Sequence, residues 1–251
     1  MIHVTLEIIL FDLNVRYNLQ NSRYLCFLID ILSMDILNRD HILFEDDVVI
    51  VLNKPAGLMV EPDRNGYPNL LQQVKKYIKG STTLPGEVYA QHIHRLDRPV
   101  SGIVLFAKQR SVLKNLSEQF AERRVKKFYQ ALTTQAPAVK TNTLEQWHRK
   151  EKKKAVLYEQ EVPFSEKVKL NYTITDYNGS RFLWDIELHT GKYHQIRAQL
   201  AHLDCAIIGD SLYRSTIPYR PNSIALHARK LTFFHPITNV ETNIIAENTF
   251  K

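Results

Sequence analysis

The feature that most constrains the fold is a hairpin signal in the second half of the chain. Two strand-like stretches, residues 172–175 and 181–188, flank the dipeptide Asn178-Gly179. Asn-Gly favours the backbone conformation of tight hairpin turns, so the two stretches are predicted to pair as antiparallel strands. Further strands are expected at residues 48–52, 103–107 and 127–133, and helices at 70–78, 112–120 and 193–203. Strands joined by short turns and interspersed with helices predict an α+β domain with a mainly antiparallel sheet.

Composition narrows the class of protein. The chain has 251 residues, 44% of them hydrophobic, which is enough for a proper core, and its net charge of +7 suits a polyanionic partner. Its two cysteines, Cys26 and Cys205, are far apart and form no CxxC pair, which argues against a disulfide framework and a cysteine-based zinc site. No apolar run approaches the roughly 18 residues that a membrane span needs. We therefore expect a cytoplasmic protein that does not enter membranes.

Residues 94–102 (HRLDRPVSG) carry the main chemical signal. One carboxylate, Asp97, lies between two arginines in a turn-like segment and is followed at once by an apolar run. Nearby cations favour the ionised form of a carboxylic acid. An ionised Asp on a loop at the edge of a strand is a candidate nucleophile or electrostatic stabiliser. For an isolated Asp, a salt bridge or a local turn would be the better interpretation.

The string 94–102 resembles the active-site motif of the RluA family of pseudouridine synthases. Other segments resemble further motifs of that family and occur in the family's order: 53–57 (NKPAG), 127–129 (KFY), 190–197 (TGKYHQIR), 207–210 (IIGD), 226–228 (LHA) and 235–238 (HPIT). The resemblance spans roughly residues 44–240. It implies the pseudouridine synthase fold, an α+β domain with a mixed, mainly antiparallel sheet flanked by helices and a central RNA-binding cleft.

The resemblance implies three catalytic residues. Asp97 would attack the target uridine, either at the uracil ring or at the sugar C1′, and both alternatives stay open. Tyr129 would stack on the flipped uracil and take or relay the proton lost from C5. Arg197 would form an ion pair with Asp97 and keep it charged. The product is an isomer of the substrate, and the family uses no cofactor and no metal.

Six further residues are expected to bind the substrate or to arrange the site around it. The resemblance assigns Arg95 to holding the displaced base or filling the space that the flipped nucleotide vacates. The other five are His94 (orienting the Asp97 loop), Arg98 (following Asp97), Ile196 (an apolar wall), and Arg123 and Arg124 (phosphate contacts). The mixed Lys/Glu run at 149–154 is more typical of a solvated hairpin tip.

The domain organisation is expected to be simple. Residues 34–251 are predicted to form the catalytic domain, as a monomer. Residues 1–33 match nothing in the family and are too few for the S4-type RNA-binding domain of its larger members. They are either a translated upstream region, a poorly ordered extension, or an element that packs on the edge of the domain.

Other functions remain as alternatives. A protein kinase would need a Gly-rich loop and an Asp-Phe-Gly motif, and neither accompanies Asp97. A glycosidase would need a second catalytic carboxylate, and Asp210 is a weak candidate because no comparable motif surrounds it. The alternative from another class is a catalytically silent RNA-binding or ribosome-assembly protein on the same fold. For an enzyme, tRNA and large-subunit rRNA are equally good substrates, because the sequence does not separate them.

Overall fold

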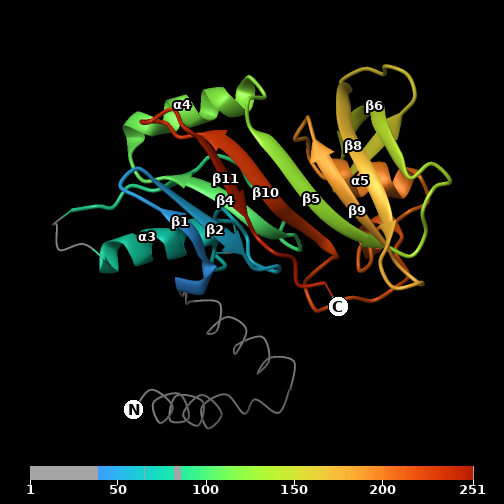
Figure 1. Ribbon diagram of the computed structural model, residues 1–251, viewed down its shortest axis with the longest axis horizontal. Helices are drawn as coiled ribbons and strands as arrows, with labels where there is room; N and C mark the ends of the chain where they lie inside the picture. The colour runs from blue at the N-terminus through green and yellow to red at the C-terminus, as the bar shows by residue number, and fades with distance from the viewer. Residues whose placement is uncertain (1–38, 65, 82–85, 251) are drawn as a thin grey trace, which may run out of the picture. The chain divides into compact units, whose positions relative to one another are not determined.

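The computed structural model of the chain describes residues 39–64, 66–81 and 86–250 (Figure 1). The expected extension, residues 1–33, and its boundary with the catalytic domain lie outside this range and stay predictions. Within the described range, no helix is long and apolar enough to cross a membrane.

The described residues form one sheet of eleven strands. Nine of them follow the order β1-β2-β4-β10-β5-β9-β8-β6-β7, while β3 pairs with β4 and β11 with β10. The bounds of the strands are β1 (Ile42–Glu45), β2 (Val49–Lys54), β3 (Gln91–His92), β4 (Ser101–Ala107), β5 (Lys126–Thr133), β6 (Thr141–Glu151), β7 (Lys154–Tyr158), β8 (Glu166–Asp176), β9 (Phe182–Leu188), β10 (Leu226–Phe234) and β11 (Glu241–Ile245). The helices are α3 (Leu70–Gly80), α4 (Arg110–Ala121) and α5 (Gln195–His202), with short 3-10 turns η1 (Arg39–His41) and η2 (Ser211–Tyr213).

Strand direction confirms the predicted fold class. Among the described strands, β4 and β10 form the only parallel pair, with Ser101 opposite His227, and every other strand pair is antiparallel. Strands β10 and β5 run side by side in the middle of the sheet (Figure 1), with β1, β2 and β4 on one side of the pair and β6 to β9 on the other. The fold is therefore α+β with a mixed, mainly antiparallel sheet.

The first half of the sheet is held by a continuous apolar core. Strand β4 is buried along nearly its whole length, as a central strand with both faces covered should be. Helix α4 presents Val112 and Leu116 to this core, at the four-residue spacing that puts them on one helix face. Each such side chain contributes about 1.5–3 kcal/mol when removed from water. Helix α3 is capped by Asn69, whose Oδ1 accepts a hydrogen bond from Gln72 N at 3.1 Å.

The second half is built from hairpins. Strands β8 and β9 pair as predicted, and their turn contains Gly179 at a φ of +75°. Residues 135–155, for which no regular element was predicted, form most of a second hairpin, β6–β7. Its turn passes through Lys152, at a φ of +52°, so the charged run is indeed a hairpin tip. Two of the three buried residues of β6, Gln146 and His148, are polar, so the strand lacks the apolar pattern on which the prediction depended.

Candidate active site

A cavity of about 330 Å³ opens beside the junction of β10 and β5, within the size range of small-molecule sites. Its walls come from the β3–β4 loop, from β5 and from the segment that leads into α5. It brings together six of the nine predicted site residues, namely His94, Arg95, Asp97, Tyr129, Ile196 and Arg197.

The loop that carries Asp97 is fastened to the loop after β2. Gly57 N donates to Arg98 O at 2.8 Å, and the Arg98 guanidinium returns a hydrogen bond to Gly57 O at 2.9 Å. Within the loop, Val100 N donates to Asp97 O at 3.0 Å and closes a turn. The backbone from Asp97 to Val100 is thus held by hydrogen bonds.

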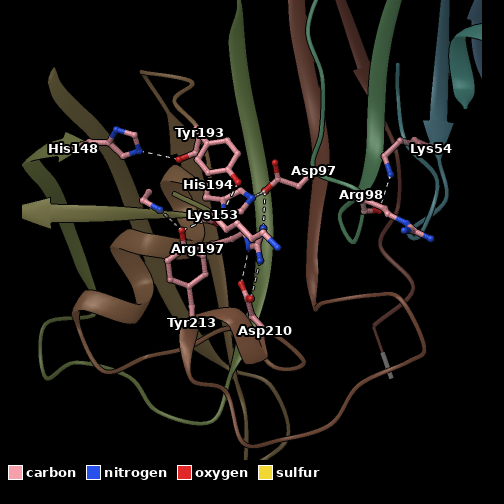
Figure 2. A network of polar contacts seen from close by, with 11 residues as sticks. Lys54, Asp97, Arg98, His148, Lys153, Tyr193, His194, Arg197, Asp210 and Tyr213 are labelled. Atoms are coloured by element: carbon pink, nitrogen blue, oxygen red, sulfur yellow. Dashed lines mark hydrogen bonds and ion pairs between the residues drawn. The ribbon is translucent and has the colours of Figure 1, made fainter. Parts of the chain in front are cut away.

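Lys54 joins the same two loops (Figure 2). Its fully buried ammonium donates to the carbonyl oxygens of Pro55 (2.9 Å), Leu58 (2.8 Å) and Arg98 (3.3 Å). Burial lowers the pKa of Lys54 to about 7, although the negative charge of Asp97 works in the opposite direction. The sequence marked this lysine within a motif and gave it no role. In the structure it organises the backbone that positions Asp97.

A glycine lets β4 start close against β10. Gly102 has a φ of +116°, and a Cβ atom there would lie 2.3 Å from Ala228 O. No other residue type fits this combination of backbone conformation and contact. The serine-glycine pair at the end of the motif therefore places the Asp97 loop next to the central strands.

Arg197 is the main charged partner of Asp97 (Figure 2). Its Nη1 donates to Asp97 Oδ2 at 3.0 Å, while its Nε and Nη2 hold both oxygens of Asp210 at 2.7 and 2.8 Å. Burial alone would lower the pKa of Arg197, but the hydrogen bonds and charges of Asp210 and Asp97 raise it above its usual value. The predicted ion pair is present, and Asp210, which sequence reasoning set aside, anchors it.

His194 makes the second contact to the same Asp97 oxygen. Its Nε2 lies 3.5 Å from Asp97 Oδ2, and its Nδ1 lies 3.2 Å from the hydroxyl of Tyr213. That hydroxyl accepts from Ala155 N at 2.8 Å, so its own hydrogen is available for His194 Nδ1. The imidazole proton is then on Nε2, facing Asp97. Burial lowers the pKa of His194 to about 4, against the influence of Asp97, so the ring is neutral at neutral pH.

The backbone at His194 is strained, and contacts of the neighbouring Tyr193 hold it in place. Its φ of +52° is in the left-handed region, which explains why α5 begins two residues later than predicted. The ring of Tyr193 stacks on that of His194 with centroids 3.8 Å apart. The buried His148 holds Tyr193 O at 2.8 Å, and the Tyr193 hydroxyl donates to Lys153 O at 3.2 Å. The β6–β7 hairpin thus helps to fix the second partner of Asp97 (Figure 2).

Tyr129 faces the cavity from β5. The side chain is 9% exposed. Burial, with a further contribution from the negative charge of Asp97, raises the pKa of its phenol. The hydroxyl is therefore protonated throughout the neutral range.

His94 holds the start of the Asp97 loop against the core. Its Nε2 accepts a hydrogen bond from Leu105 N at 3.2 Å, and its ring stacks on Phe120 with centroids 5.0 Å apart. Burial lowers the pKa of His94 to about 3, and the nearby charge of Lys127 acts in the same direction. The role of His94 in orienting the loop stays a prediction.

Arg95 lies at the mouth of the cavity. Its side chain is 62% exposed, and its guanidinium pairs with Glu61. His92 Nε2 lies 3.4 Å from the other oxygen of the same carboxylate. The arginine that the sequence assigned to the displaced base is thus paired with an acidic side chain.

Three predicted substrate contacts do not line the cavity. The Arg98 guanidinium turns to Gly57 O and lies 5.8 Å from the ring of Tyr67, so here it supports the loop. Arg123 and Arg124 follow α4 and are exposed, and Arg124 pairs with Glu122 at 2.8 Å. Contacts between these three side chains and RNA stay predictions.

The chain is similar to known proteins along most of its length. Residues 48–202 match the family described as RNA pseudouridylate synthase. The chain is 32% identical over 214 residues to the uncharacterized RNA pseudouridine synthase YhcT of Bacillus subtilis (strain 168), covering 83% of this chain and 68% of that one. It is 30% identical over 220 residues to ribosomal large subunit pseudouridine synthase C of Buchnera aphidicola subsp. Baizongia pistaciae, covering 81% and 65%. The chain thus spans about two thirds of the length of these two relatives.

Two further similarities bear on substrate and fold. The chain is 28% identical over 223 residues to tRNA pseudouridine synthase C of Vibrio parahaemolyticus serotype O3:K6, covering 80% of this chain and 87% of that one. The solved structure of human RNA pseudouridylate synthase domain containing 4 superimposes with a TM-score of 0.69 at 22% identity, covering 86% and 92%. That structure supports the fold.

Proposed function

Because the chain belongs to the RNA pseudouridylate synthase family, isomerases that convert uridine to pseudouridine in RNA, we propose that Asp97 is its nucleophile. One observation carries this proposal. Both contacts to the Asp97 carboxylate, from Arg197 and His194, converge on Oδ2, and no described residue hydrogen-bonds Oδ1. One oxygen is thus held while the other is available to a substrate in the cavity.

The chemistry needs no group beyond this carboxylate and a proton carrier. Asp97 Oδ1 attacks the uridine at uracil C6 or at the sugar C1′, and the bond between N1 and C1′ breaks. The uracil turns over, C5 joins C1′, C5 loses its proton and N1 gains one, so the product is an isomer. The carboxylate departs with its electron pair as an anion that Arg197 stabilises.

Tyr129 is suited to stacking and to proton exchange as a neutral phenol. Its raised pKa argues against a phenolate that would itself take the C5 proton. A protonated hydroxyl can still pass a proton on while receiving one from C5. The ring, next to Asp97 in the same cavity, offers an apolar face for a uracil.

Entry into the cavity requires the uridine to leave its base stack, at a cost of a few kcal/mol. Among the basic residues that line the cavity, the Arg95 side chain is 62% exposed, compared with 41% for Lys192 and 6% for Arg197. We assign Arg95 to the RNA helix that the uridine leaves. Its present partner, Glu61, would be exchanged for a phosphate or a base edge.

The proposed substrate is a specific uridine in structured RNA, either tRNA or large-subunit rRNA. The relatives include one named for tRNA and one for the large ribosomal subunit, so both classes are proposed with equal weight. The net charge of +7 supports a polyanionic substrate of this kind.

The test is to incubate the purified chain with separate unmodified tRNA and rRNA pools. Pseudouridine is then mapped by carbodiimide labelling and reverse transcription. We expect new pseudouridine at one or a few positions in one pool. Tight binding to both pools without new pseudouridine would instead favour the silent RNA-binding protein.

A further inference from the structure

The charges in the cavity are not all balanced by the protein itself. Four residues that line the cavity have basic side chains: Arg95, Lys127, Lys192 and Arg197. Three of them pair with carboxylates: Arg95 with Glu61, Lys192 with Glu166, and Arg197 with Asp97 and Asp210. For the Lys127 ammonium, the described part of the chain offers no hydrogen-bond acceptor and no ion-pair partner.

Lys127 reaches the cavity from the same strand as Tyr129. Side chains two residues apart on a strand point to the same face and lie about 7 Å apart. Lys127 and Tyr129 on β5 both line the cavity, as this alternation requires. On the opposite wall, a Cβ atom at Gly191 would be 3.3 Å from Lys127 Nζ. The ammonium therefore lies between β5 and the segment that leads into α5.

An unpaired cation in this position is unfavourable in the free protein. Burial, with repulsion from Arg123, lowers the pKa of Lys127. An anion bound next to the ammonium would reverse both effects, since an opposite charge within about 4–6 Å favours the charged form. The cavity is thus arranged for a ligand with a negative group at this end and an uncharged ring near Tyr129 and Asp97.

We propose that Lys127 is a phosphate-binding residue of the active site and takes a phosphodiester group that flanks the extruded uridine. The inference rests on the proposed function, because it assumes that a nucleotide enters the cavity. When the uracil stacks on Tyr129, the phosphates of the same nucleotide lie to one side of the ring. Their distance from the ring is of the same order as the spacing of about 7 Å between the side chains of Tyr129 and Lys127. Lysine suits the task, because its ammonium binds phosphate as a point charge.

The contact has a distinct kinetic consequence. Lys127 meets the phosphate only after the uridine has left its stack, so the interaction stabilises states that follow initial RNA binding. Its loss should lower the rate at saturating RNA. Loss of a lysine that touches only the undistorted RNA surface should instead weaken binding.

The neighbouring residue provides a matched control. Lys126 is exposed, precedes Lys127 on β5 and is not among the residues that line the cavity. The substitutions Lys127→Met and Lys126→Met each remove one positive charge and keep an unbranched side chain. Lys127→Arg keeps the charge, and thermal melting verifies that all three variants fold.

The measurement is single-turnover pseudouridine formation at saturating RNA, on whichever pool the wild type modifies. We expect Lys127→Met to lower the rate about ten- to hundredfold, as for loss of a hydrogen bond to a charged group. Lys127→Arg should recover part of this loss, and Lys126→Met should stay within about twofold of wild type. Equal small effects of the two methionine variants, or an effect of Lys127→Met on RNA affinity alone, would overturn the assignment.

A second measurement does not depend on turnover. If the wild type is inactive on every RNA pool, the proposed function is refuted, and this second measurement still tests whether Lys127 binds phosphate. The lysines of the full chain are ¹³C-methylated, and the Lys127 signal is identified from its absence in Lys127→Arg. Titration with uridine 5′-monophosphate or 3′-monophosphate should move this signal and raise the pKa of Lys127, whereas uridine should not. The more effective nucleotide identifies the phosphate. A signal that stays unmoved at millimolar concentrations of both would contradict the inference.

Discussion

Asp210 holds Arg197 by two parallel hydrogen bonds, of 2.7 and 2.8 Å, and its side chain is 1% exposed. This clamp leaves Nη1 of the guanidinium directed at Asp97 Oδ2, 3.0 Å away. The position of the proposed nucleophile thus depends on a carboxylate that lies further from the cavity.

Replacing Asp210 with Asn should destabilise the fold and reduce activity together. The change leaves a buried guanidinium with one carboxylate partner, and breaking a buried ion pair costs about 3–5 kcal/mol. Urea unfolding measures the loss of stability. The control is Glu122→Gln, which breaks the exposed pair with Arg124 and should cost less than about 1 kcal/mol. Equal stability of the two variants would argue against a structural role for the Asp210 clamp.

His194→Gln should flatten the dependence of stability on pH. Folded His194 stays neutral down to about pH 4, whereas an unfolded histidine binds a proton near pH 6.5. Between these values the unfolded state binds more protons, so wild-type stability falls as the pH is lowered. Other buried histidines, such as His94, keep part of this slope in the variant.

The experiment compares urea unfolding at pH 7 and pH 5. A slope in His194→Gln as steep as that of the wild type would show that burial does not hold the His194 ring neutral in the folded protein.

Glu61→Gln should tighten RNA binding severalfold. The substitution removes a negative charge at the mouth of the cavity and releases Arg95 from its partner. Charges at the rim of an interface act mainly on association rate and on salt dependence. Stopped-flow measurements give the association rate with RNA. The control is Glu241→Gln, which removes an exposed carboxylate on β11 and so separates this local effect from a change in net charge. Weaker binding by Glu61→Gln would mean that Glu61 positions Arg95 for RNA.

Gly102→Ala should be among the most destabilising single changes in the chain. The added Cβ would meet the backbone of Ala228 at 2.3 Å, in a conformation with a φ of +116°. We expect a loss of at least about 3 kcal/mol. Gly80→Ala is the matched control, since nothing lies within 4 Å of its Cβ position and its φ is unremarkable. Similar melting temperatures for the two variants would contradict this account of the β4–β10 contact.

Local sequence patterns predicted most of the helices and strands, and the structure explains why one hairpin was missed. The Asn-Gly hairpin and the helix at 112–120 depend on residues close in sequence, and both are present. The β6–β7 hairpin was missed because the inward-facing residues Gln146 and His148 of β6 are polar. The family and the enzyme class, which depended on motifs, are confirmed by the match over residues 48–202.

The arrangement of the site could be predicted only in part. The pairing of Arg197 with Asp97 was expected, but the roles of Asp210 and Lys54 arise from contacts between segments far apart in the chain. His194 shares the helix start with Arg197, yet its left-handed backbone depends on support from another hairpin. A periodic pattern in one sequence carries no information on such contacts.

The most direct test of the account is tritium release from RNA labelled at uracil C5, comparing wild type with Asp97→Asn. The variant keeps the shape of the side chain, and Arg197 stays clamped by Asp210. We expect Asp97→Asn to bind RNA like wild type and to release tritium at least about a thousandfold more slowly. Release by Asp97→Asn at the wild-type rate would show that Asp97 is not the nucleophile.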